Sequence, residues 1–331
     1  MDLNTILPHL LYEFPHEADL LKAIEELSKK FTVERDCIED YLRDPRLASA
    51  YTAFYLATNL PKFEAILPWF SQEILEGLKS SSLIDVGAGP GTFSLAFRQW
   101  KGPGEILQIE NSRLMGEQAR ALWNGLYPDE EILQNTSLKS PGPKLMLFGH
   151  SANEMGSREA LNYISTHDPE HILFIEPGTK DFFPKMLEIR ESLLEKGYRV
   201  LYPCPDSINC PLRDTEDWCH QYVHVSHSPD VERLSQMAGK DRRNLPLIVH
   251  LYSRTLPFMG THERVLRVYP ETKFSFEWDV CHKNQKEHYQ IQKRNLSKSE
   301  QKKMAQRTPG DSVETELEKE FDGIKRVRIK S

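Results

Sequence analysis

Residues 81–97 read SSLIDVGAGPGTFSLAF, and this short stretch decides the fold class. The apolar run SLIDV is typical of a buried strand, and the segment after the glycines has the spacing of a helix. Three glycines lie between them, at positions 87, 89 and 91. A tight turn from strand to helix needs residues without a Cβ atom, because they adopt positive φ and let a ligand approach the backbone. The stretch therefore predicts a strand, a glycine turn and a helix.

Strand and helix patterns alternate through the following 160 residues. We expect further strands at 104–111, around 130–134, and at 143–150, 171–178, 198–203 and 245–255, with helical segments between most of them. Gly197 stands where a helix would end, directly before YRVLYP. Such alternation indicates an α/β fold with a mostly parallel, doubly wound sheet.

The pattern differs on either side of this domain. Residues 1–80 have helical spacing, and Cys37 falls in one of these helical patterns, which indicates a core thiol. We expect an α/β domain at 81–255 with a cysteine-bearing insertion at 203–221. FSFEWDV alternates residue by residue and indicates a β extension at 256–294. Residues 295–331 are polar, and we expect a flexible tail.

Composition narrows the class of protein. The chain has 331 residues, 39% hydrophobic and 27% charged, as in a soluble globular protein. It lacks the long apolar run of a membrane span, and its N-terminus resembles neither a secretory signal nor a transit peptide. We expect a bacterial cytoplasmic protein, or a mitochondrial matrix form without its presequence. In either compartment the five cysteines would be reduced rather than paired in disulfides.

Charge is unevenly distributed, although the net charge is −7. Residues 282–307 carry eight Lys and Arg against Glu287 and Glu300, and the C-terminal IKRVRIKS is basic again. This segment is either a solvated tail or a surface for phosphate groups.

The glycine turn has the spacing D-x-G-x-G-x-G, and Thr92 stands where dinucleotide-binding turns have their third glycine. The turn resembles the first motif of class I S-adenosylmethionine methyltransferases. An acid at the end of the second strand suits two ribose hydroxyls, and Glu110 has that place. The resemblance implies S-adenosylmethionine as cofactor, bound by Asp85, Gly87, Gly89, Gly91 and Glu110.

The methyl acceptor is harder to identify. The chain has no Asn-Pro-Pro-Tyr or Asp-Pro-Pro-Tyr after the fourth strand, so the signature of adenine amino-group methylation is missing. His150 and Glu154 stand there instead. They either act as a base or cap and orient the next helix, and the catalytic residue stays unknown.

Three cysteines cluster in YPCPDSINCPLRDTEDWCHQ, residues 202–221. A Pro-Cys nucleophile, as in cytosine C5 methyltransferases, would follow the fourth strand, whereas Cys204 follows the sixth. With the distant Cys281, the set offers four thiolates for an iron–sulfur cluster or a zinc ion. The spacing lacks the paired knuckles of zinc ribbons, but His220 and His282 keep a mixed zinc site open. Unliganded thiols are the third alternative.

The segment from IEPG (175–178) to WCH (218–220) resembles the methyltransferase-like proteins of small ribosomal subunit assembly. Asn153-Glu154-Met155, VLRVYP (265–270) and DVC (279–281) extend the resemblance to about residues 45–295. It implies a [4Fe-4S] cluster on Cys204, Cys210, Cys219 and Cys281. It also implies a monomer whose partners are the small subunit and its ribosomal RNA, and which does not bind a membrane.

Three functions are left open by the sequence. The first is methyl transfer to ribosomal RNA of the small subunit. The second is a non-catalytic assembly factor that uses cofactor and cluster as structural parts. The third is a small-molecule methyltransferase with a structural zinc site.

Overall fold

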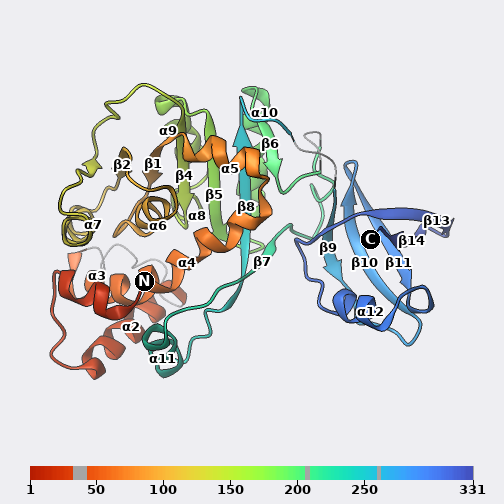
Figure 1. Cartoon of the computed structure of the whole chain (residues 1–331), viewed down its shortest axis with the longest axis horizontal. Helices are drawn as coiled ribbons and strands as arrows, with labels where there is room; N and C mark the ends of the chain where they lie inside the picture. The colour runs from red at the N-terminus through yellow and green to blue at the C-terminus, as the bar shows by residue number, and fades with distance from the viewer. Residues whose placement is uncertain (33–42, 206–208, 259–261, 331) are drawn as a thin grey trace. The chain divides into compact units, whose positions relative to one another are not determined.

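The computed structural model describes residues 1–32, 43–205, 209–258 and 262–330 (Figure 1). The chain forms two compact units: unit 1 comprises 1–152 and 223–245, and unit 2 comprises 153–222 and 246–331. The predicted helix that contains Cys37 lies outside the described residues. Among those described, no helix combines the length and the apolar character that crossing a bilayer requires.

The N-terminal part of unit 1 is helical, as predicted. It consists of α1 (Leu3–Ile6), α2 (Glu17–Thr32), α3 (Pro45–Tyr51), α4 (Ala57–Ile66) and α5 (Gln72–Lys79). Asp44 caps α3 through the amide of Arg46, and Ser71 caps α5, so both helices begin where a side chain satisfies a free N–H group. Phe63 of α4 packs edge-on against Phe97 and Trp100, which fixes α4 on the helix that follows the glycine turn.

The sheet of unit 1 has the strand order β3-β2-β1-β4, with every neighbouring pair parallel. These elements are β1 (Ser82–Val86), α6 (Thr92–Lys101), β2 (Ile106–Ile109), α7 (Arg113–Leu126), β3 (Leu133–Gln134) and β4 (Lys144–Gly149). The carboxyl ends of the parallel strands β1, β2 and β4 meet at one edge, where ligands bind in folds of this type. Unit 1 also holds α11 (Pro229–Met237).

The α/β part of unit 2 has β8 between β5 and β6, antiparallel to both. Its elements are α9 (Ser157–His167), β5 (His171–Pro177), α10 (Phe183–Glu195), β6 (Arg199–Tyr202) and β8 (Asn244–Ser253). Two short elements, α8 (Ala152–Met155) and β7 (Gln221–His224), stand at the boundaries between the units. Gly197, with φ of +84°, ends α10 at the predicted place.

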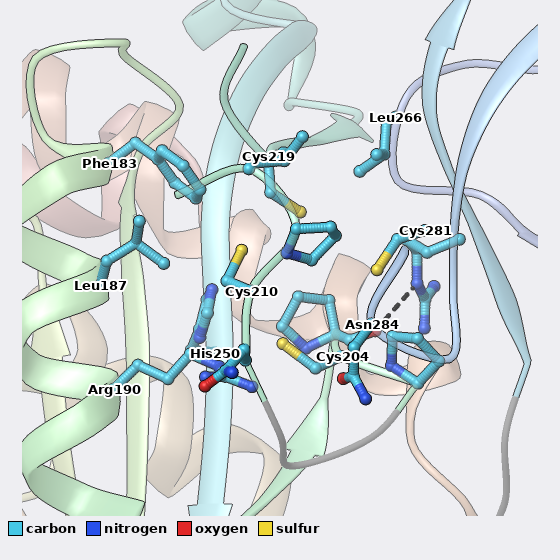
Figure 2. A pocket seen from close by; sticks show the side chains of 16 residues that line it. Phe183, Leu187, Arg190, Cys204, Cys210, Cys219, His250, Leu266, Cys281 and Asn284 are labelled. Atoms are coloured by element: carbon cyan, nitrogen blue, oxygen red, sulfur yellow. Dashed lines mark hydrogen bonds between the residues drawn. The ribbon is translucent and has the colours of Figure 1, made fainter. Parts of the chain in front are cut away.

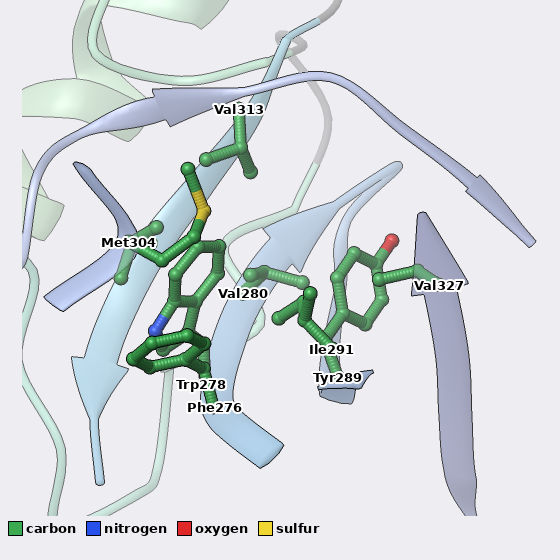
Figure 3. Close-up of a cluster of buried hydrophobic side chains, with 9 residues drawn as sticks. Phe276, Trp278, Val280, Tyr289, Ile291, Met304, Val313 and Val327 are labelled. Atoms are coloured by element: carbon green, nitrogen blue, oxygen red, sulfur yellow. The ribbon is translucent and has the colours of Figure 1, made fainter. Parts of the chain in front are cut away.

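A second sheet in unit 2 has the order β12-β9-β10-β11-β14-β13. Its strands are β9 (Glu263–Val268), β10 (Ser275–His282), β11 (Gln285–Gln292), β12 (Ser312–Val313), β13 (Thr315–Phe321) and β14 (Ile324–Ile329). Phe276, Trp278 and Val280 of β10 alternate into a buried core that Figure 3 shows from close by. Since strand side chains point to opposite faces in turn, Cys281 lies on the other face of β10.

Residues 298–329 differ from the flexible tail expected from their polarity. They form α12 (Lys298–Ala305) and β12–β14, and Met304, Val313 and Val327 join the core of the second sheet. In the β13–β14 hairpin, acids stand opposite bases, with Glu316 paired in register with Arg328 and Glu320 with Lys325. The ion pairs that form are Arg328 with Glu318 and Lys325 with Glu287 of β11 at 2.6 Å. Single apolar side chains and these ion pairs order a segment that shows little hydrophobic periodicity.

The fold class predicted from the sequence is confirmed. The chain has a largely parallel α/β sheet, with a helical N-terminal region and a C-terminal β extension.

Candidate functional site

The glycine turn after β1 depends on backbone conformations that favour glycine. Gly87, Gly89 and Gly91 have φ of +66°, +54° and +85°. A Cβ atom on Gly91 would lie 2.7 Å from Nε2 of the buried Gln108, whereas one on Gly89 would meet nothing within 4 Å. Gly91 is therefore needed for packing, and Gly89 lies on the open side of the turn.

Glu110 follows β2 directly, and its carboxylate faces this turn. Oε2 accepts a hydrogen bond from the Gly89 amide at 2.7 Å, and Oε1 accepts one from the Ser112 amide at 2.7 Å. Burial raises the pKa of Glu110, while these two amides counteract the rise. Asn135, which the sequence did not single out, holds the backbone of Glu110. Its Oδ1 accepts from the Glu110 amide at 3.0 Å, and its Nδ2 donates to the Glu110 carbonyl at 2.8 Å. The Asn111 amide also interacts with this carboxylate, which keeps acceptor capacity for a further donor.

Asp85 supports the backbone of the turn and is not exposed to a ligand. Its side chain is buried, and Oδ2 accepts from the Ser94 amide at 2.9 Å and from the Ser94 hydroxyl at 2.7 Å. Burial raises the pKa of Asp85 to about 6, with a smaller contribution from Glu110. Asp85 thus ties the first turn of α6 to the end of β1 and keeps the glycine turn closed between them.

His150, one of the two candidate bases, lies at the end of β4 in unit 1. Its Nε2 is 3.0 Å from Nζ of the buried Lys62, and its ring stacks on Phe93 at 6.1 Å. Burial, with the charges of Lys62 and Arg242, holds the pKa of His150 well below 6.5. A neutral imidazole whose Nε2 accepts from Lys62 is a weak base at that atom. Glu154, the other candidate, is exposed on α8.

Cys204, Cys210, Cys219 and Cys281 line one pocket in unit 2, as Figure 2 shows. Three come from the loop after β6 and the fourth from β10. All four are half-buried and free of disulfide bonds. The structure thus brings together the four cysteines singled out from the sequence, across a separation of more than sixty residues.

The loop that carries three of these cysteines is fastened by hydrogen bonds at both ends. Arg264 of β9 donates from Nε to the Pro203 carbonyl at 3.1 Å, next to Cys204. Nε1 of Trp218, next to Cys219, donates to the Gly178 carbonyl at 3.1 Å. Asp217 pairs with Lys286 of β11 at 2.6 Å and also with Arg267. These contacts join the loop to β9 and β11 of the second sheet and to the segment that follows β5.

The thiols influence each other's protonation. Burial raises the pKa of the Cys210 thiol to about 11, with Cys204 adding to the rise. Burial raises the pKa of Cys219 well above 9, and Cys204, Cys210 and Cys281 all contribute. As free groups these thiols stay protonated at neutral pH, so a metal group that binds them must displace protons.

Two polar residues that the sequence analysis missed reach into the same pocket. Arg190 of α10 is 2% exposed and lies beside Cys204, and Figure 2 shows its side chain near His250 of β8. Burial works to lower the pKa of Arg190, yet Cys204, Tyr252 and Cys210 raise it above its usual value. His250 contacts the Tyr252 hydroxyl at 2.8 Å through Nδ1, while its buried Nε2 has no hydrogen-bond partner among the described residues.

The geometry does not form a site for a single metal ion. Among the residues that the structure describes, no three Cys, His, Asp or Glu side chains come together closely enough to hold one. His220 and His282, the candidates for a mixed zinc site, do not line the pocket. His220 stacks on Trp218 at 5.2 Å, and Nδ1 of His282 contacts the Tyr289 hydroxyl at 2.8 Å.

Solved methyltransferases resemble the chain at low sequence identity. Magnesium protoporphyrin IX methyltransferase from Synechocystis PCC 6803, with bound SAM, shares 10% identity at a TM-score of 0.39, over 72% of this chain and 97% of that chain. Precorrin-6y C5,15-methyltransferase from Geobacter metallireducens shares 16% identity at a TM-score of 0.35, over 55% of this chain and 85% of that chain. No curated protein matches the chain in sequence.

A family model gives the more specific match. The model for Rsm22, described as mitochondrial small ribosomal subunit Rsm22, matches residues 45–309. This range includes the glycine turn, Glu110 and all four cysteines of the pocket. The chain therefore belongs to the Rsm22 family.

Proposed function

We propose that this protein binds S-adenosylmethionine at the glycine turn, holds a [4Fe-4S] cluster on its four cysteines, and methylates ribosomal RNA of the small ribosomal subunit. The observation that carries the cofactor part is the Glu110 carboxylate, which two backbone amides hold beside the open Gly89. Gly87, Gly89 and Gly91 admit the amino acid part of the cofactor, and Glu110 accepts from its ribose hydroxyls. Asp85 supports the turn through Ser94. S-adenosylmethionine supplies the methyl group.

The donor set of the cysteine pocket fits an iron–sulfur cluster. Four cysteine sulfurs are the usual ligands of such clusters, and none of the described residues that line this pocket carries a carboxylate. Arg190 provides a buried positive charge beside Cys204, as a group with several thiolates requires. Cys204, Cys210, Cys219 and Cys281 would be the ligands.

The ribosomal part of the proposal rests on family membership. We place the protein with the small subunit, as a monomer without a membrane, in the mitochondrial matrix or a bacterial cytoplasm. A second function, that of a non-catalytic assembly factor, is favoured by one observation: Nε2 of His150 is engaged by Lys62, so no clear base stands at the end of β4.

Cofactor binding is tested by titrating anaerobically purified protein with S-adenosylmethionine in a calorimeter. Gly89→Arg fills the open side of the turn and should abolish the binding heat. Gly102→Arg is the matched control, because Gly102 also has a positive φ and open space around it but stands at the end of α6. Retained affinity in Gly89→Arg would show that the cofactor binds elsewhere.

Methyl transfer is tested by incubating the protein with immature small ribosomal subunits and cofactor carrying a labelled methyl group. Label in the RNA supports the enzyme. Cofactor binding without transfer would contradict it and leave the assembly factor.

The cluster is tested by metal analysis of the anaerobic protein. We expect about four irons per chain together with inorganic sulfide. One zinc per chain without iron would overturn the cluster and favour a structural zinc site.

A further inference from the structure

One aromatic side chain of the second sheet is held out to solvent. Phe274, on the turn between β9 and β10, is 74% exposed. The turn is braced by Thr272, whose Oγ1 accepts from the amides of Phe274 at 3.1 Å and Ser275 at 2.9 Å. Phe274 is thus presented on a fixed turn rather than on a loose loop.

The turn is joined to the segment that follows β11. The Lys293 amide donates to the Phe274 carbonyl at 2.9 Å, and Nε2 of Gln301 in α12 donates to the Lys293 carbonyl at 3.0 Å. Met304 anchors α12 in the core of the second sheet (Figure 3). A capping box of Ser297 and Glu300 fixes the start of this helix. The Phe274 turn and α12 therefore form one supported surface.

This surface carries an excess of exposed positive charge, although the Glu300 carboxylate also interacts with Lys303. Five of its cations are exposed and make no ion pair with any described residue: Lys273, Arg294, Lys298, Lys302 and Lys303. The acids nearest in sequence are already engaged, Glu271 with Lys293 at 2.6 Å and Glu300 in the capping box. Nζ of Lys273 stands 5.7 Å from the Phe274 ring. We call these five cations with Phe274 the basic platform.

We propose that the basic platform binds single-stranded RNA, with an unpaired base stacked on Phe274 and the adjoining phosphates on the five cations. An exposed ring on a surface whose cations make no ion pair is the combination with which proteins bind single strands, because every base has a face to stack. In a duplex the base faces are covered, so Phe274 would gain nothing there. The inference deepens the proposed function, on which it rests for RNA as the partner, and needs neither the cofactor nor the cluster.

The charge part is tested with a fluorescent oligouridylate, whose binding to the full chain is measured by anisotropy over a range of salt concentrations. Each phosphate contact on a single strand contributes roughly −0.7 to the slope of log K against log salt, so five contacts predict about −3.5. Lys298→Gln with Lys302→Gln should make the slope shallower by about 1.4. Lys22→Gln with Lys29→Gln, two lysines of α2, is the matched control and should leave it unchanged.

The stacking part is tested by Phe274→Ala. Affinity should fall on the order of 10-fold with no change in the salt slope, because a stacked base releases no counterions. Phe274→Trp should keep the affinity. Leu317→Ala, which removes another exposed apolar side chain of the same sheet, should have no effect.

The inference would be overturned by unchanged affinity in Phe274→Ala, by tighter binding of an RNA duplex of equal length, or by preference for phosphatidylserine vesicles over RNA. Wild-type protein that ignores oligouridylate yet sediments with small ribosomal subunits would also overturn it, while leaving the proposed function standing. Binding of oligouridylate without any association with small subunits would instead remove the ribosomal part of the proposed function.

Discussion

The glycine turn of unit 1 and the cysteine pocket of unit 2 differ in how far the chain completes each site by itself. At the turn, the carboxylates already have partners, since Asp85 is bonded to Ser94 and Glu110 to the amides of Gly89 and Ser112. In the pocket, burial and the three neighbouring thiols raise the pKa of Cys219, and a buried arginine lies beside Cys204. The turn is shaped before any ligand arrives, whereas the pocket contains charges that suit a bound group.

This difference has an energetic consequence. A ligand that fills a preformed turn adds its binding energy to a structure that is already stable. A metal group that displaces protons from four thiols contributes to folding itself, because the unfolded chain cannot offer the same set of ligands. Substitutions at the pocket should therefore change both the metal content of the protein and the stability of its fold. Substitutions at the turn should mainly affect the local backbone.

The largest expected effect is that of Cys219→Ser. Cys219 interacts with all three other cysteines of the pocket, so its loss leaves an incomplete set of ligands. We expect nearly all iron to be lost from anaerobically purified protein, together with a lower melting temperature. Iron analysis and thermal unfolding measure the two effects. Cys37→Ser, at the fifth cysteine, is the control, and equal iron loss there would mean that the effect reflects thiol count and not the pocket.

The second prediction concerns pH and Asp85. Burial raises the pKa of Asp85 in the folded protein to about 6, above the ordinary value of about 3.9. Between these values the folded chain binds more protons than the unfolded chain, so this group's contribution to stability falls as pH rises from about 4 to about 6. A shift of about 2 units corresponds to on the order of 3 kcal/mol.

Asp85→Asn isolates this effect, because the amide does not ionise. The free energy of unfolding of the wild type, relative to that of the variant, should decline across this pH window and become constant above it. Urea unfolding at several pH values measures the difference, with the exposed Asp129→Asn as control. A relative stability that rises with pH would contradict the burial of this carboxylate without a positive charge beside it.

The third prediction compares two glycines of the same turn. Alanine at either position takes a positive φ, which costs roughly 1–2 kcal/mol. At Gly91 the new Cβ also displaces Gln108, whose Oε1 accepts from Gln134 at 3.1 Å, and the lost bond adds about 1 kcal/mol. Gly91→Ala should therefore unfold at a lower urea concentration than Gly89→Ala. Equal midpoints would show that Gln108 moves aside freely.

Contiguous sequence was enough to predict the turn, because one strand–turn–helix unit and the next strand supply all its residues. The sequence offered the same four cysteines as one set of candidate ligands, but no local pattern joins Cys281 to a loop sixty residues earlier, and only the family resemblance favoured a cluster over zinc or unliganded thiols. The place of Arg190 in the pocket could have been predicted from helical spacing. Arg190 stands four residues after Met186 and three before Leu193, both buried, and so shares the buried face of α10.

The C-terminal segment was misjudged for a different physical reason. Met304, Val313 and Val327 each contribute one side chain to a core that β9, β10 and β11 build. Isolated apolar residues give no periodicity, so tertiary contacts order residues 298–329 where local propensity does not. The exposed Phe274 and the unpaired lysines of α12 likewise became meaningful only once the sheet placed them together.

We expect the smallest effect from replacing Arg190. This substitution is also the sharpest test of the difference between the turn and the pocket. Its charge lies beside Cys204 and Cys210, so it should stabilise a cluster with net negative charge. If the pocket holds the proposed cluster, Arg190→Met should lower its reduction potential and speed its loss in air a few-fold, about 1 kcal/mol in a barrier. Arg190→Lys, which keeps the charge, should recover part of both. Potentials measured by spectroscopic titration decide the matter, because a purely structural role would change stability and leave the potential where it was.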